Sequence, residues 1–436
     1  MELHIIQSLK GDCILLESKD GKLILVDGGM GPSMKEYGRD AIHEIANGRK
    51  LEAAYVSHID QDHIAGVLQL LKDELAWRAF DFQSTSGANA KMPDFPKPPE
   101  IKTIWHNAFR DQVSKNRGAI ENLLAAAAPA FLATGVPEIA RTGLEMQAIA
   151  LSIPEALEVS KLASSDLLDI PVNKIPGAQG PTKLLMRRDG QQPFKVGAMS
   201  LSILGPGPKE LRDLRKGWDE WLRKNHESVA RLRSKIKDNI DIIGAAEAGD
   251  DVFALRDWNG IEDYKGVTTP NIASLMFFVE EAGKRIILTG DSQQDFILEG
   301  LDSLGHLAGG FCHVDVLKVQ HHGSENNVDR DFCRKVSADH YVFCGNGEHG
   351  NPEPEVVEMI YESRLGAEAK NRALAPQAAG KPFKFWFSTT SKMQRENSDE
   401  RENFEEIEAL VETLKARSGG KLQAVFNDKS FMTLKV

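Results

Sequence analysis

Short runs of apolar residues alternate with polar segments along the first part of the chain. Residues 3–6, 13–17 and 23–26 are rich in Leu, Ile and Val, which predicts three short strands. Lys19-Asp20-Gly21-Lys22 separates the last two and is typical of a hairpin turn. A helix is predicted over 37–47. The pattern therefore begins as a small sheet followed by a helix.

The same alternation continues to the end of the chain. After a strand predicted over 51–57, apolar residues recur at helical spacing from Ile64 to Ala76. Further strands are predicted over 101–106, 200–204, 273–280, 285–289, 314–319, 383–388 and 430–436, and further helices over 353–365 and 403–417. Polar clusters directly follow several of these strands. This arrangement is typical of α/β enzymes, whose catalytic groups collect at strand ends.

Two helical stretches interrupt the alternation, and we interpret them as insertions in one fold. The segments are a first half (1–110), a helical insertion (111–195), a return strand (196–208), a charged helical insertion (209–262), and a second half with a C-terminal helix and strand extension (263–436). Because polar strand ends occur in both outer segments, one catalytic fold needs nearly the whole chain.

Composition narrows the class of protein. The 436 residues are 41% hydrophobic and 27% charged, which is enough for a large core. No apolar run is long enough to cross a bilayer, and the first residues lack the pattern of a signal peptide. We therefore expect a cytoplasmic protein without membrane contacts. The four cysteines contain no CxxC pair, which favours free, mostly buried thiols.

The strongest candidate for chemistry is the loop His58-Ile59-Asp60-Gln61-Asp62-His63. Its two imidazoles and two carboxylates are the ligands that divalent transition metals prefer. Four such groups exceed what one tetrahedral ion takes from adjacent residues, so the loop favours a site for two ions. The alternative is a solvated polar turn in which an aspartate caps the following helix.

Other strand ends carry further candidates. Asp291 directly follows a strand, although an aspartate there is also a common helix cap. His321 and His322 follow another strand, and either is a candidate ligand. The supporting or lower-ranking candidates are Asp27, His106, His349 and Lys318. For His106 and His349 a purely structural role is equally consistent, and Lys318 is suited either to contact an anion or to face solvent.

Taken in order, these segments resemble the metallo-β-lactamase superfamily, in particular the hydrolase domain of the bacterial DNA-uptake channel ComEC and its soluble relatives. The similarity lies in residues 11–16, 25–29, 58–66, 204–206, 271–275, 289–291 and 318–324. Residues 58–66 are similar to the HxDxDHxGG loop of that group, with Ala65 replacing one glycine. The motifs cover about 1–110 and 200–350.

The resemblance implies a four-layer αβ/βα sandwich with helical insertions and two divalent metal ions, zinc or manganese, at one edge of the sheets. The implied metal ligands are His58, Asp60, Asp62, His63, Asp291 and His321, with His322 as the alternative to His321. Asp291 would bridge the ions and Asp27 would brace the loop. Asp60 replaces a histidine of the wider superfamily, and an oxygen ligand there favours harder ions such as Mn²⁺. His106 is the one candidate for the superfamily's intervening histidine.

This ligand set predicts a hydrolase. A hydroxide bridging two cations is nucleophilic at neutral pH, and the cations neutralise charge on a phosphoryl or carbonyl oxygen. Asp62, His63 and Asp291 are the predicted catalytic residues. We expect a nuclease or phosphodiesterase in a bacterial defence or DNA-processing system. The alternatives are a hydrolase of small esters, lactones or phosphodiesters, and a metal-stabilised adaptor without activity.

A basic segment within the second insertion supports a nucleic-acid substrate. Residues 209–238 hold ten Lys or Arg against six acidic residues, with Trp218 and Trp221 among them, in a chain of net charge −11. Basic and aromatic side chains together are suited to phosphates and bases. The residues expected to contact nucleic acid are Arg223, Lys224, Arg231 and Arg233. The alternative is an amphipathic helix with Trp in the core. The insertions are also candidate surfaces for a protein partner.

Overall fold

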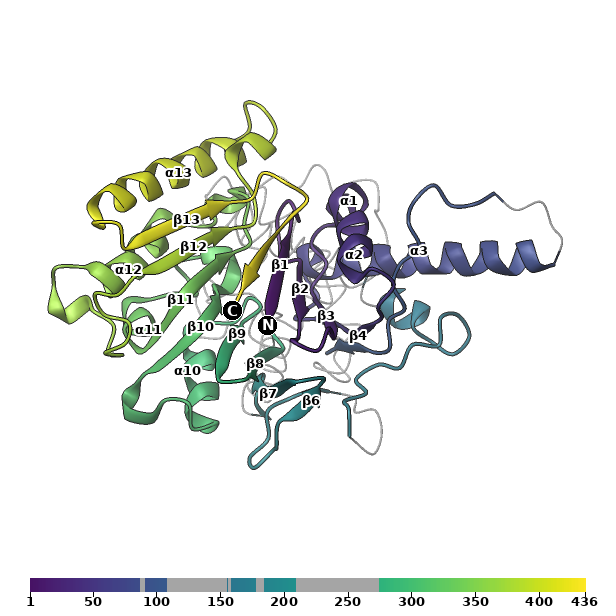
Figure 1. The fold of residues 1–436 in the computed structure, drawn as a ribbon, viewed down its shortest axis with the longest axis horizontal. Helices are drawn as coiled ribbons and strands as arrows, with labels where there is room; N and C mark the ends of the chain where they lie inside the picture. Colours follow the sequence, from purple (N-terminus) through teal and green to yellow (C-terminus); the bar gives the residue numbers. More distant parts are fainter. Residues whose placement is uncertain (87–90, 108–154, 156–157, 178–183, 209–273) are drawn as a thin grey trace, which may run out of the picture.

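The computed structural model describes residues 1–86, 91–107, 155, 158–177, 184–208 and 274–436 (Figure 1). The charged insertion predicted over 209–262 lies outside these residues, as does most of the insertion predicted over 111–195. The predicted nucleic-acid contacts at Arg223, Lys224, Arg231 and Arg233 also lie outside the described residues.

The strands form two mixed sheets. The first has the order β14-β1-β2-β3-β4-β5. Its strands are β1 (Glu2–Ile6), β2 (Ile14–Glu17), β3 (Leu23–Val26), β4 (Leu51–Val56), β5 (Ile104–His106) and β14 (Phe431–Lys435). β3, β4 and β5 are parallel, and the other neighbours are antiparallel.

The second sheet has the order β13-β12-β11-β10-β9-β8-β7-β6. Its strands are β6 (Phe194–Val196), β7 (Met199–Gly205), β8 (Met276–Glu281), β9 (Lys284–Leu288), β10 (Cys312–Lys318), β11 (Val336–Phe343), β12 (Phe383–Phe387) and β13 (Leu422–Phe426). β9 to β13 run parallel, so their carboxyl ends lie at one edge.

Helices connect and cover these strands. They are α1 (Gly31–Ser33), η1 (Met34–Gly38), α2 (Arg39–Ala46), α3 (Gln61–Thr85), α10 (Gln294–Ser303), η5 (Ala308–Gly310), η6 (Gln320–Gly323), α11 (Arg330–Lys335), η7 (Glu348–Gly350), α12 (Pro354–Leu365), η8 (Ala369–Asn371), η9 (Ser391–Met393) and α13 (Asp399–Arg417). Local sequence explains some of their ends: the side chain of Ser398 accepts a hydrogen bond from the Arg401 amide and caps α13.

Three hydrophobic clusters hold the elements together. One lies between the two sheets and includes Val26 and Tyr55 from the first sheet and Phe277 from the second. Another joins the first sheet to η1, α2 and α3. The third joins the second sheet to α10, α11, α12 and α13, which lie on the opposite side of the molecule from α2 and α3 (Figure 1).

The α/β class predicted from the sequence is confirmed, and the predicted strands are present within a few residues of their expected bounds. Three strands (β6, β11, β13), the helices α10 and α11, and the three- and four-residue helical turns were not predicted. β11 contains Asp339 and His340, which break its apolar pattern, and β13 is a half-exposed edge strand. α3 is longer than predicted, because it begins at Gln61 inside the polar loop and continues beyond Ala76 to Thr85.

Two expectations from composition can also be compared with the structure. All four cysteines are buried and unpaired, as predicted. Within the described part of the chain, no helix has both the length and the apolar character needed to cross a bilayer.

Candidate metal centre

The carboxyl ends of parallel strands from both sheets bring the predicted site residues together. In the first sheet, β3 is followed by Asp27, β4 by Ser57 and His58, and β5 ends at His106. In the second sheet, β9 is followed by Asp291 after two residues, and β10 by the paired histidines on η6. This is the place where open α/β sheets usually bind ligands.

The polar loop after β4 continues directly into a helix. Asp60 occupies the N-cap position of α3, but its side chain makes no capping hydrogen bond. Instead its Oδ2 lies 3.5 Å from Nε2 of His58. Asp62 and His63 belong to the first turn of the same helix. The geometry therefore disfavours the interpretation of this loop as an ordinary capped turn.

Four imidazoles direct the same nitrogen at one carboxylate oxygen. Nε2 lies 3.3 Å from Oδ2 of Asp291 in both His63 and His322, 3.7 Å in His58 and 3.9 Å in His321. Two of these histidines come from the first sheet's side and two from η6. Asp291 is thus the centre of the cluster, and both sheets contribute to it.

An oxygen atom lies near the other ring nitrogen, Nδ1, of each imidazole. The contacts are His63 with Asp27 Oδ2 (2.9 Å), His58 with Ser57 Oγ (3.0 Å), His321 with Asn327 Oδ1 (2.6 Å) and His322 with Asp12 Oδ1 (3.3 Å). Carboxylate and amide oxygens only accept hydrogen bonds, so Nδ1 carries the proton in the bonds of His63 and His321, and a proton there also suits the longer contact of His322 with Asp12. This tautomer leaves the lone pair of Nε2 facing Asp291, which is the arrangement of a metal-binding histidine.

Asp27 fixes the loop as well as the ring of His63. It is fully buried, and Oδ1 accepts a hydrogen bond from the Ser57 amide at 2.7 Å. Oδ2 accepts from the Ser57 hydroxyl at 2.7 Å and from Nδ1 of His63. These hydrogen bonds connect the end of β3 to the loop after β4 and to the first turn of α3.

The residues present fit a metal ion by a separate criterion. Nε2 of His58, His63 and His322 and one carboxylate oxygen each of Asp60 and Asp291 are buried without a hydrogen-bond partner in the described part of the chain. Buried polar atoms are normally paired, because an unpaired one loses its hydration without compensation. Nitrogen and oxygen donors left over together are the set that a zinc or manganese ion would satisfy.

The charges of the cluster act strongly on one another. Burial by itself lowers the pKa of His63 and His322, but the carboxylates around them, Asp291 foremost, hold both well above the usual value. Burial raises the pKa of Asp291, yet His322, His63 and Lys318 outweigh it and keep that pKa well below its ordinary range. Shifts of this kind concentrate at functional sites.

Three residues in or beside the cluster also have unusual backbone geometry. Asp27, His321 and His322 have φ angles of 55°, 48° and 55°, in the left-handed region that non-glycine residues rarely adopt. Such conformations cost about 1–3 kcal/mol each and persist where the surroundings enforce them. Their concentration at one site is typical of residues placed for function.

The remaining predicted residues have different surroundings. His106 is buried at the end of β5, and neither ring nitrogen has a hydrogen-bond partner in the described part of the chain. Burial, helped by the neighbouring His58, lowers the pKa of His106 to about 4. His349 lies on η7 with its side chain about half exposed, 3.7 Å from Glu348.

Lys318 does not face solvent, contrary to one of the two interpretations made from the sequence. It is buried at the end of β10, where its Nζ pairs with Asp12 and donates a hydrogen bond to the Gly290 carbonyl at 3.0 Å. It is also 3.6 Å from Oδ1 of Asp291. A cation held in this way supports the carboxylates and is not free to contact a substrate anion.

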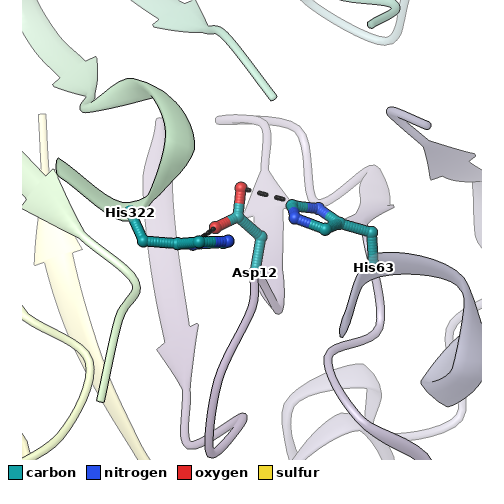
Figure 2. Close-up of side chains that lie close together, drawn as sticks. All are labelled: Asp12, His63 and His322. Carbon is teal, nitrogen blue, oxygen red and sulfur yellow. Dashed lines mark ion pairs between the residues drawn. The ribbon is translucent and has the colours of Figure 1, made fainter. Parts of the chain in front are cut away.

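Asp12 is a further member of the cluster that was not predicted from the sequence. Figure 2 shows its carboxylate between the rings of His63 and His322. Asp12 lies in the hairpin loop before β2, at the same edge as the strand ends. Its position after Gly11, in a polar turn between two apolar strands, is the signal that could have identified it.

Two glycines allow the close approaches that build this edge. Gly11 has φ +87°, and a Cβ there would lie 1.8 Å from the backbone oxygen of Asp62. A Cβ on Gly66 would lie 1.9 Å from the oxygen of Gly28. The close contact with Gly28 is thus made by Gly66, and the methyl group of the neighbouring Ala65 does not take part in it. The departure from the motif at position 65 is therefore structurally tolerated.

A scan against models of protein families found no match to the chain, and a search of curated proteins found no similar sequence. The resemblance to the metallo-β-lactamase superfamily consequently stays a prediction from motifs.

Proposed function

We propose that the chain is a metal-dependent hydrolase of the metallo-β-lactamase superfamily that cleaves phosphodiester bonds in nucleic acid. The observation that carries the proposal is the convergence of four imidazole Nε2 atoms on Asp291, with Asp60 and Asp62 beside them. This donor set is larger than one closed structural ion uses, which favours catalysis over a stabilising role.

The arrangement of the three hydrophobic clusters supports the proposed fold. Helices pack on one side of two facing sheets and other helices pack on the far side, which supports the αβ/βα sandwich that the motifs imply. The cluster at the strand ends then corresponds to the metal-binding edge of that fold.

We propose two divalent ions, zinc or manganese. His58, Asp60 and Asp291 would hold one, and Asp62, His63, His322 and Asp291 the other. His322 takes precedence over the predicted His321, because its Nε2 is closer to Asp291 and also lies 3.2 Å from Asp62. His106, beside His58, is a further candidate for the first ion. When bound, such ions activate water and offset negative charge on the reacting group.

The exposure of the side chains in the cluster indicates where a substrate would enter. The side chains of His58, His63 and Asp291 are at most 3% exposed, whereas those of Asp62 and His321 are 19% and 18% exposed. The open side of the cluster is thus lined by Asp62 and His321. A carboxylate in this position is suited to accept a hydrogen bond from the attacking water and to orient it.

The preference for nucleic acid rests on the sequence of the charged insertion. Its first part, residues 209–238, holds ten Lys or Arg against six acidic residues, and with Trp218 and Trp221 it is suited to a phosphodiester polymer. A bacterial defence or DNA-processing system in the cytoplasm, with a protein partner docking on the insertions, would suit such an activity.

Cleavage assays test the proposal. Single- and double-stranded DNA and RNA would be incubated with Mn²⁺, Zn²⁺ or Mg²⁺ and wild type, Asp62→Ala or Asp291→Asn. Asp73→Asn is the matched control, because Asp73 is a buried carboxylate of α3 that binds Gln69 outside the cluster. We expect metal-dependent cleavage that both site variants abolish and the control retains. Cleavage that survives both site variants would refute the assignment.

A second comparison tests the substrate class. Charge reversal at Arg223, Lys224, Arg231 and Arg233 is expected to reduce cleavage of polynucleotides and to leave a small chromogenic phosphodiester unaffected. Equal losses on both substrates would refute a role of this segment in binding nucleic acid. Turnover of small phosphodiesters or lactones alone would favour a small-molecule hydrolase instead.

A further inference from the structure

Asp12 is a buried carboxylate with partners from both halves of the site. It is 1% exposed, and its Oδ1 lies 3.3 Å from Nδ1 of His322. Its Oδ2 pairs with Nζ of Lys318 and lies 4.0 Å from Nδ1 of His63. Asp12 belongs to the first sheet's hairpin, whereas Lys318 ends β10 of the second sheet and His322 follows it on η6. The contacts of Asp12 therefore cross from one sheet to the other.

Lys318 completes this connection. Its side chain is 2% exposed, and it reaches Asp12, the Gly290 carbonyl and Oδ1 of Asp291. A buried ammonium group needs such partners, because water no longer solvates it. The ion pair therefore fixes the position of Asp12 relative to the strand that carries the paired histidines.

The surroundings of His322 resemble those of His63, although its contact with a carboxylate is longer, at 3.3 Å against 2.9 Å. Asp27 contacts Nδ1 of His63 on one side of the cluster, and Asp12 contacts Nδ1 of His322 on the other. In both rings Nε2 faces Asp291 at 3.3 Å. A carboxylate behind a metal-binding imidazole fixes its tautomer and orientation and raises its basicity.

We infer that Asp12 is a positioning residue that orients His322 as a metal ligand, and that Lys318 holds Asp12 in place. This inference rests on the proposed metal centre. It also gives a reason for the choice between the paired histidines, since Asp12 faces His322 whereas His321 has the neutral amide of Asn327 at its Nδ1.

Asp12 is close enough to His63 and His322 to be considered a ligand itself. Two contacts argue for the positioning role. Lys318 already occupies Oδ2 of Asp12, and a cation bound there would be repelled by the ammonium group. His63 directs its Nδ1 to Asp27, so its free nitrogen faces Asp291 and not Asp12.

Metal affinity provides a test that is independent of activity. Zn²⁺ and Mn²⁺ binding would be measured by competition with a chromophoric chelator for wild type, Asp12→Asn, Lys318→Met, the double variant and the control Asp73→Asn. Thermal unfolding in EDTA would report the stability of each without metal. We expect Asp12→Asn to lower the affinity for one of the two ions by about 10–100-fold and to leave the affinity for the other nearly unchanged.

The double variant separates positioning from stability. Losing one member of a buried ion pair is more harmful than losing both, so Asp12→Asn with Lys318→Met should unfold at a higher temperature than Lys318→Met alone. Its metal affinity should stay as low as in Asp12→Asn, because the carboxylate behind His322 is still absent. A double variant that recovers metal affinity together with stability would overturn the inference. An Asp12→Asn protein that binds metal as tightly as wild type would overturn it as well.

The outcomes also distinguish this inference from the proposed function. If wild type binds metal, Asp12→Asn binds it more weakly, and no nucleic acid is cleaved, the proposed activity fails while the role of Asp12 stands. If wild type binds no metal, both are refuted.

Discussion

Replacing Asp27 should separate the folding role of a buried carboxylate from its effect on a metal ligand. Asp27 accepts hydrogen bonds from the Ser57 amide, the Ser57 hydroxyl and Nδ1 of His63. Asp27→Ala leaves three buried donors without an acceptor, and each unsatisfied group costs about 1–3 kcal/mol. Because the three losses share one site, we expect a total of about 3–5 kcal/mol.

Asp27→Asn keeps the shape of the side chain and one oxygen acceptor. The carbonyl oxygen can still accept from the Ser57 amide, and the new NH₂ group can donate to the Ser57 hydroxyl. However, the NH₂ group cannot accept from His63, so Nδ1 must lose its proton and Nε2 must gain it. A protonated Nε2 has no lone pair for a metal. We therefore expect a stability loss of only about 1–2 kcal/mol, but metal affinity about 10–100-fold lower.

Thermal unfolding and chelator competition measure the two effects. At about 2.1 cal/mol/K per residue, the unfolding entropy of a chain of 436 residues is roughly 0.9 kcal/mol/K, so 1 kcal/mol corresponds to about 1 °C. Asp27→Ala should lower the midpoint in EDTA by about 3–5 °C, and Asp27→Asn by about 1–2 °C. An Asp27→Asn protein that binds Zn²⁺ as tightly as wild type would refute the assignment of Nε2 of His63 as a ligand atom.

Other predictions follow from packing, burial and unpaired groups. Gly66→Ala should destabilise the folded protein by about 1–3 kcal/mol or more, because the new Cβ would meet the Gly28 oxygen. Ala65→Gly is the matched control, and equal midpoints of thermal unfolding for the two variants would contradict the close approach. Burial raises the pKa of all four cysteine thiols, that of Cys312 to about 11. Iodoacetamide at pH 8 should therefore modify these buried thiols only after unfolding, and rapid labelling of the native protein would be inconsistent with this. His106→Phe replaces two unpaired buried nitrogens by carbon, so the midpoint of thermal unfolding in EDTA should not fall. The affinity for Zn²⁺ should decrease, and an unchanged affinity would remove His106 from the candidate ligands.

The sequence was sufficient to predict which residues meet in the cluster around Asp291, because strand ends can be recognised locally. Asp291 and His321 lie far from the loop of His58 in the chain, yet each follows an apolar run that could be identified as a strand. Parallel strands end at a common edge, so these separate positions meet in space. The same reasoning gave the α/β class.

The orientation of individual rings could not be predicted in this way. His321 and His322 are adjacent, and the choice between them depends on φ angles and on contacts with Asn327 and Asp12. Asp12 was missed because its partner Lys318 lies in the other sheet, and no local pattern connects the two. β11 was missed because burial between neighbouring strands, and not an apolar pattern of its own, stabilises it.

The measurement that tests the account most directly is the number of divalent ions bound per chain, determined by elemental analysis after dialysis against Zn²⁺ or Mn²⁺. We expect about two ions for wild type and a clear loss for Asp291→Asn, since Asp291 lies at the centre of the cluster. Asp73→Asn should bind as wild type does. A wild-type protein that binds no ions, or an Asp291→Asn protein that binds as many as wild type, would contradict the account.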